Sequence, residues 1–114
     1  MAKLSEETTA TILSLKGQSL EIVNQATAAE FTLFELFGET DETLSYLDEM
    51  KNVAEEAASS FSQLSTLQLN IAQAQLTAAP DMLELLAQVI ARTQFRIPAL
   101  ERSVQEVKME WNLP

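Results

Sequence analysis

The feature of this sequence that most constrains its fold is a mostly apolar residue at every third or fourth position through three long segments. Because an α-helix turns once in 3.6 residues, this spacing places these residues on one face of a helix. The first such stripe contains Ile12, Leu15, Ser19, Ile22, Ala26, Ala29, Leu33 and Leu36. The second contains Tyr46, Met50, Val53, Ala57, Ser60, Leu64, Leu67, Ile71, Ala74 and Ala78. The third contains Leu83, Leu86, Ile90, Thr93, Ile97, Leu100, Val104, Val107 and Trp111.

Residues that start and stop helices flank the first stripe. Ser5 is a favourable N-cap, and two glutamates follow it in the first turn, where negative charge is stabilised by the helix dipole. Gly38 follows the stripe and is typical of a helix C-terminus. Gly17 lies inside the segment, away from the stripe, and weakens a helix by about 1 kcal/mol relative to alanine without breaking it.

Similar signals separate the second and third stripes. Thr40 and Asp41 provide a second N-cap. Pro80 is expected to end the second helix, because the residue before a proline is driven out of the helical region. Asp81 and Glu84 then match the Asp-x-x-Glu pattern of a capping box at the start of the third helix.

These boundaries predict an all-α fold of three long helices at about 5–37, 41–79 and 81–112. The connections are short, so consecutive helices run antiparallel and the chain forms an up-down-up bundle. Pro98 removes one backbone hydrogen bond from the third helix. The stripe keeps its phase across Pro98, which favours one kinked helix, whereas a break there would give four helices. The whole chain, residues 1–114, is expected to be a single helical-bundle domain.

The composition excludes several classes of site. The 114 residues include no cysteine and no histidine. Disulfides, thiolate zinc sites, cysteine nucleophiles and histidine general bases are therefore ruled out. Two glycines cannot form a glycine-rich phosphate loop, and no acidic residue lies on a predicted stripe to build a carboxylate cage in the core. We expect no enzyme activity and no catalytic, cofactor-binding or metal-binding residues.

Acidic residues dominate the first half of the chain. Seventeen Asp and Glu against seven Lys and Arg give a net charge of −10, of which residues 1–57 carry −9. This charge repels phosphate backbones, so no binding to nucleic acid is expected. The uncharged run over residues 57–80 holds eleven Ser, Thr, Gln or Asn residues, too many for a membrane-spanning helix. The N-terminus lacks the apolar core of a signal peptide, so a cytoplasmic location is expected.

The predicted helices carry more apolar residues than their stripes require. A helix in a three-helix bundle needs an apolar face about three positions in seven wide, whereas residues 31–37 contain five apolar residues. Large exposed apolar patches are rare on monomers. The sequence therefore predicts a candidate interaction surface formed by Phe31, Phe34, Phe37, Leu44, Leu47, Leu69, Leu76, Leu85, Val89 and Phe95.

The second predicted helix also has a polar face that is nearly free of charge. Its members are Asn52, Glu56, Ser59, Gln63, Thr66, Asn70, Gln73 and Thr77. Another helix can cover such a face without the cost of desolvating ions. The face can equally be a solvated surface that happens to carry little charge.

The up-down-up topology predicts an aromatic cluster at one pole of the bundle, where the first helix ends, the second begins and the third ends. The aromatic residues expected to meet there are Phe31, Phe34, Phe37, Tyr46 and Trp111. Aromatic pairs contribute about 0.5–1.5 kcal/mol beyond their buried area. This pole is therefore the expected anchor of the bundle.

Together these patterns predict a non-catalytic module for protein–protein interaction or assembly that associates with itself, most often as a dimer, through helix faces. The alternative is a small acidic helical chaperone or adaptor whose apolar groove holds an amphipathic helix of a partner protein. A third possibility is an acidic mimic that occupies a nucleic-acid site on another protein. None of these functions requires a cofactor or a membrane.

Overall fold

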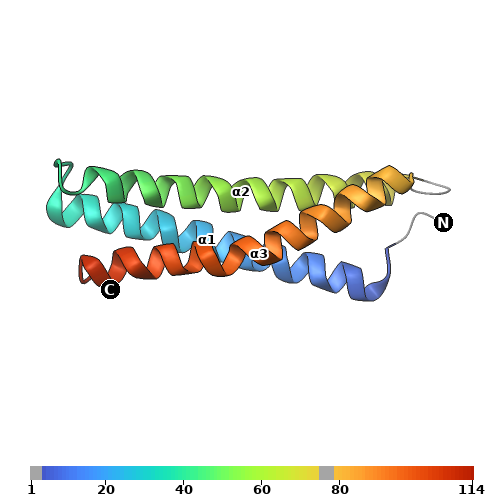
Figure 1. The fold of residues 1–114 in the computed structure, drawn as a ribbon, viewed down its shortest axis with the longest axis horizontal. Helices are drawn as coiled ribbons and strands as arrows, with labels where there is room; N and C mark the ends of the chain where they lie inside the picture. Colours follow the sequence, from blue (N-terminus) through green and yellow to red (C-terminus); the bar gives the residue numbers. More distant parts are fainter. Residues whose placement is uncertain (1–3, 75–78) are drawn as a thin grey trace.

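A computed structural model describes residues 4–74 and 79–114. The described residues form three helices, α1 (Glu6–Phe37), α2 (Leu44–Gln73) and α3 (Pro80–Glu110), and contain no strand. Figure 1 shows α2 running antiparallel to α1 and α3, with all three packed side by side in an elongated bundle. The predicted all-α, up-down-up fold is confirmed.

Both ends of α1 are fixed by the residues predicted for them. Ser5 Oγ accepts a hydrogen bond from the Thr8 N–H at 3.1 Å, as an N-cap does. Gly38 has a φ of +72°, a left-handed conformation that favours glycine, and its N–H donates to the Phe34 carbonyl at 2.8 Å. The first helix therefore has the predicted bounds.

Two threonines close the turn between α1 and α2. Thr43 Oγ1 accepts from the Thr40 N–H at 2.9 Å, and Thr40 Oγ1 accepts from the Thr43 N–H at 3.1 Å. This reciprocal pair follows the logic of a capping box. The buried Thr43 hydroxyl also donates to the Gly38 carbonyl at 2.8 Å, which ties the turn to the end of α1. The predicted N-cap at Thr40 and Asp41 is therefore wrong, because these residues belong to the turn and the α-helix begins at Leu44, after Thr43, rather than at residue 41.

The predicted end of the second helix at residue 79 is wrong. Helix α2 ends at Gln73, and Ala74 has an extended conformation with ψ of 109°. Ala74 is a predicted stripe position, but alanine buries little area, so extending the helix over it gains little stabilisation. Ala78 lies outside the described residues.

Pro80 begins α3 and does not end α2. A proline suits the first helical position, because its φ is already helical and that position needs no N–H donor. The predicted capping box between Asp81 and Glu84 does not form, since the helix starts one residue earlier, with Ala79 at the N-cap and no side-chain cap hydrogen bond.

Helix α3 continues through Pro98 as one element, so the four-helix alternative is wrong. Figure 1 shows α3 changing direction between its orange and red halves. Pro98 lies exposed on the outside of the bundle, where its ring costs one hydrogen bond without disturbing the core.

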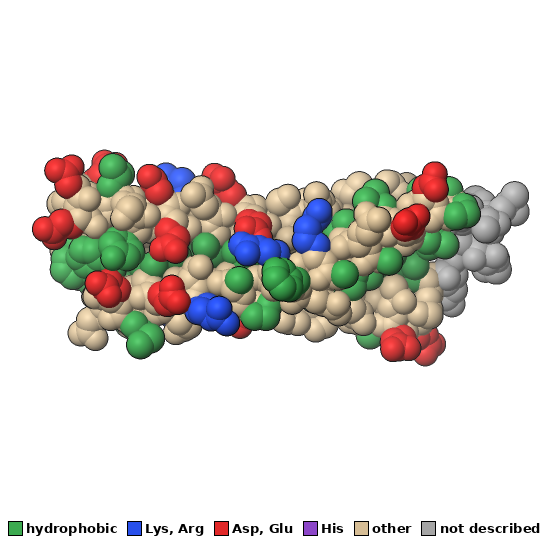
Figure 2. All heavy atoms as spheres, in the orientation of Figure 1, with side chains coloured by type: hydrophobic (Ala, Val, Ile, Leu, Met, Phe, Trp, Pro, Cys, Tyr) green, Lys and Arg blue, Asp and Glu red, His purple; other side chains and the backbone are tan. Residues whose placement is uncertain are grey.

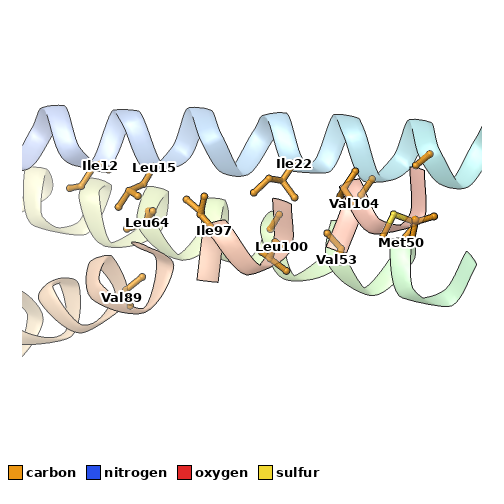
Figure 3. Packing of buried hydrophobic residues seen from close by; sticks show 14 of the residues in the cluster. Ile12, Leu15, Ile22, Met50, Val53, Leu64, Val89, Ile97, Leu100 and Val104 are labelled. Atoms are coloured by element: carbon orange, nitrogen blue, oxygen red, sulfur yellow. The ribbon is translucent and has the colours of Figure 1, made fainter. Parts of the chain in front are cut away.

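The core consists of the predicted stripes, pointing inward from all three helices. Figure 3 shows side chains from each helix meeting along the bundle axis. The buried members predicted on α1 are Ile12, Leu15, Ser19, Ile22, Ala26, Ala29 and Leu33. Those on α2 are Met50, Val53, Ala57, Leu64, Leu67 and Ile71. Those on α3 are Leu86, Thr93, Ile97, Leu100, Val104 and Val107.

At two predicted stripe positions, the residue that is buried is the sequence neighbour of the predicted one. Leu47 is buried where Tyr46 was predicted, and Val89 is buried where Ile90 was predicted, while both predicted residues are half-buried. Residues three and four positions from a buried residue lie on the same side of a helix as that residue. The 3.6-residue period therefore does not decide which of two adjacent residues is buried. Packing against the neighbouring helices decides between them.

Leu36 and Leu83, also predicted for the stripes, are exposed. Leu36 lies in the last turn of α1 and Leu83 in the first turn of α3.

The core assignment predicts that two leucines of α2 contribute very differently to the free energy of unfolding. Leu64 is fully buried, so Leu64→Ala is expected to lower the free energy of unfolding by about 2–5 kcal/mol. Leu69 is 57% exposed, and Leu69→Ala is expected to change it by less than about 1 kcal/mol. Urea denaturation followed by circular dichroism measures both. Equal losses for the two variants would contradict the phase of α2.

Candidate functional site

The structure divides the predicted interaction surface into three groups. Seven of its ten members are exposed, and these are Phe31, Phe34, Phe37, Leu44, Leu69, Leu85 and Phe95. Leu47 and Val89 are buried in the core, 7% and 3% exposed, so they are not available on the surface. Leu76 lies outside the described residues.

The exposed apolar residues of α1 belong to a second stripe on the face turned away from the core. This outer stripe comprises Leu13, Gly17, Leu20, Asn24, Thr27, Phe31 and Phe34. All seven are exposed, and their spacing alternates between four and three residues, as at the contact positions of a coiled coil. The spacing was present in the sequence, but Gly17, Asn24 and Thr27 interrupt its apolar pattern and obscure it.

Contacts to α2 mark one edge of the outer stripe. Lys16 Nζ donates to Gln68 Oε1 at 3.3 Å and lies 5.2 Å from the centroid of the Phe61 ring. Further along α1, a Glu30 oxygen lies 3.6 Å from Lys51 Nζ. One basic and one acidic residue of α1 therefore flank the outer stripe on the side of α2.

A groove of about 370 Å³ runs between α2 and α3. Its lining residues are Ser59, Ser62, Gln63, Thr66, Leu67, Leu85, Gln88, Val89 and Arg92. Three of these, Ser59, Gln63 and Thr66, belong to the nearly uncharged face predicted on the second helix. The nearly uncharged face of α2 thus forms one wall of the groove, and α3 forms the other.

Two arginines fasten α3 to α2 beside the groove. Arg96 donates from Nε and Nη2 to the two carboxylate oxygens of Glu56, at 2.6 and 2.9 Å. The hydrogen bond from Arg96, reinforced by the positive charges of Arg96 and Arg92, holds the pKa of Glu56 below its ordinary value. Arg92 Nη2 donates to Gln63 Oε1. The side chains of Arg96 and Glu56 are both 41% exposed, so this ion pair positions the helices more than it stabilises them.

The predicted aromatic pole forms in part. The ring centroid of Trp111 lies 5.0 Å from that of Phe37 and 5.4 Å from that of Tyr46, the latter in an edge-on arrangement. Phe31 and Phe34 were predicted to join this cluster, but they are 64% and 53% exposed. They project from the outer face of α1, whereas Phe37, in the last turn, points toward the end of α3.

Charge is unevenly divided between the two ends of the bundle. The end formed by residues 21–58 and 95–114 carries thirteen acidic and four basic residues, a net charge of −9. The described residues of the other end carry four acidic and two basic residues, a net charge of −2. Figure 2 shows most acidic side chains of the visible face over the end where α1 leads into α2.

The sequence matches no protein-family model, no curated protein and no solved structure. Within residues 4–74 and 79–114, no three acidic side chains gather in a way that could hold a metal ion. No helix in the described part of the chain has the length and hydropathy needed to cross a membrane. Two features that suit an interaction are the outer stripe of α1 and the groove between α2 and α3 that Leu85 lines.

The contact between Phe37 and Trp111 predicts the fluorescence emission of the folded protein. Trp111 is the only tryptophan, and its fluorescence in the folded protein is expected to be blue-shifted relative to the unfolded chain. Phe37→Ala should shift this emission to the red, because it opens one face of the indole to water. Phe34→Ala, which removes an exposed ring, should leave the emission unchanged. Emission at the solvent-exposed maximum in the folded protein would contradict the cluster.

Proposed function

We propose that this chain is a non-catalytic protein–protein interaction module that assembles with itself, as a dimer, through its helix faces. The observation that carries the proposal is the number of large apolar side chains that the bundle leaves exposed on all three helices. On α1 alone, Leu13, Leu20, Phe31 and Phe34 are each at least half exposed. Exposed apolar area of this extent is typical of a surface that another protein covers.

The absence of catalysis is proposed from the chemistry of the side chains. The chain offers neither histidine nor cysteine as a general base or nucleophile. Glu56 is the carboxylate with the most defined surroundings, and Arg96 holds its pKa below the ordinary value. A carboxyl group with a lowered pKa stays ionised near neutral pH and is a poor general acid there.

A second candidate function rests on the groove between α2 and α3. An adaptor or chaperone that binds an amphipathic helix needs apolar residues on the floor of a groove and polar residues at its rim. Leu85 is the exposed apolar residue of this groove, above the buried Leu67 and Val89, and Ser59, Gln63 and Thr66 line it beside them. This function requires a monomer that binds a helical peptide, so it differs from self-assembly in a measurable way.

Self-assembly predicts a mass that depends on protein concentration and on salt. Sedimentation velocity from low micromolar to several hundred micromolar protein is expected to show a monomer–dimer equilibrium. Because each copy carries a net charge of −10, raising NaCl from about 0.02 M to about 0.5 M should screen the repulsion and favour the dimer. A monomer at all concentrations and both salt levels would contradict self-assembly. Gain of helix by an added amphipathic peptide would then favour the adaptor.

A further inference from the structure

We propose that the outer stripe of α1 is the surface on which two copies of this chain pair, with their α1 helices antiparallel. This inference rests on the self-association proposed above and specifies its interface and geometry. The stripe runs from Leu13 to Phe34, about 32 Å at 1.5 Å per residue, and each of its positions is exposed. Its alternating spacing of four and three residues is the spacing by which one helix packs along another.

Gly17 is a position that the isolated bundle does not explain. A glycine inside a helix costs about 1 kcal/mol relative to alanine, yet a Cβ built at Gly17 meets no described atom within 4 Å. No contact with the residues that the structure describes therefore requires a glycine there. A second helix lying on the outer stripe provides a reason, because a missing side chain lets the two backbones approach and leaves room for a large side chain.

An antiparallel pairing supplies that large side chain. The outer stripe has its two phenylalanines, Phe31 and Phe34, at one end and Leu13 with Gly17 at the other. When two copies pair antiparallel, the aromatic end of each lies over the Leu13–Gly17 end of the other. A parallel pairing would instead put the four phenylalanines together at one end and the two glycines together at the other, so that neither glycine would receive a large side chain.

Asn24 lies at the midpoint of the outer stripe, where the two-fold axis of an antiparallel pair would pass. There the Asn24 amide of one copy faces the Asn24 amide of the other, and each can donate and accept a hydrogen bond. A single polar residue at a contact position of this kind fixes the register and direction of a helix pair at some cost in stability.

The charges beside the stripe also favour the antiparallel direction. In this direction Lys16 of one copy faces Glu30 of the other, Glu21 faces Ala28, and Glu35 faces an uncharged residue. In a parallel pair, Lys16 of each copy would face Glu21 of the other, but Glu30 would face Glu35, and like charges so placed are destabilising. The antiparallel flanks therefore contain opposite charges and avoid pairs of like charge.

The distribution of charge between the two ends of the bundle also favours the antiparallel direction. One end of the bundle carries a net charge of −9, and the described residues of the other end carry −2. A parallel dimer would lay the two strongly acidic ends side by side, whereas an antiparallel dimer lays each against the weakly charged end of its partner. Both ends are negative, so the antiparallel direction is the less repulsive of the two for a second copy.

Two variants test the surface, and a third serves as a matched control. Leu20→Glu and Gly17→Glu each place a charge within the proposed interface, and each is expected to raise the dimer dissociation constant at least about 30-fold. Leu69 is on α2 and is exposed to a similar extent, 57% against 50% for Leu20, so Leu69→Glu should leave the dissociation constant unchanged. Gly17→Glu should also raise the urea midpoint of the monomer, because glutamate favours a helix over glycine.

Single cysteines test the direction, because the chain has none of its own. Under mild oxidation, Asn24→Cys is expected to form a disulfide-linked dimer by itself. Leu13→Cys and Phe34→Cys should each fail to do so alone and should cross-link to one another when the two variants are mixed. Efficient cross-linking of Leu13→Cys with itself would overturn the antiparallel direction.

The outcomes separate this inference from the proposed function. A wild-type protein that is monomeric throughout would overturn both. A wild-type dimer that Leu69→Glu dissociates and Leu20→Glu does not would overturn the interface on α1 and leave self-assembly standing. Loss of the dimer in Leu20→Glu and Gly17→Glu alone, with both monomers folded by circular dichroism, supports the interface.

Discussion

Burial of one narrow seam on each helix is the interaction on which this structure depends. The seam of α1 includes Ser19, Ala26 and Ala29, which are small and fully covered by the other two helices. Small seam residues bring helix axes close together, so the core is thin and extends along the whole bundle. Each helix buries seven residues, and most of the buried apolar residues are Val, Ile, Leu or Met, so one seam per helix fills the core. The remaining apolar residues are left outside, and for this reason the bundle has an apolar surface at all.

Much of this fold could be predicted from local chemistry. Ser5, Gly38 and the period of the stripes each act within one or two turns of helix, so the sequence alone reveals them. The choice between Leu47 and Tyr46 could not be predicted in this way, because both satisfy the period and only packing against the other helices separates them. Pro80 was misassigned for a related reason, since a proline is compatible with the position after one helix and with the first position of the next.

The candidate surface was predicted less completely than the fold. Apolar residues in excess of the core were evident from composition, and most of those named are exposed. Their grouping into one stripe was not evident, because a search for apolar residues passes over Gly17, Asn24 and Thr27. In the bundle these three residues share one location, because they lie on the same outward face of α1 as Leu20 and Phe31. In the proposed dimer, the acidic end limits which partners can approach, and the uncharged stripe is the contact surface.

The most direct test of this arrangement is the distance between spin labels on the two copies of a dimer. A nitroxide attached at Glu35→Cys lies near one end of the outer stripe, on an exposed position of α1. An antiparallel pair centred at Asn24 predicts a separation of about 35 Å along the helix axes, from a rise of 1.5 Å per residue. A parallel pair brings the two helix axes to within about 10 Å, and the labels would be correspondingly close. A single distance distribution near about 35 Å is the predicted result, and a distribution centred below about 20 Å would contradict it.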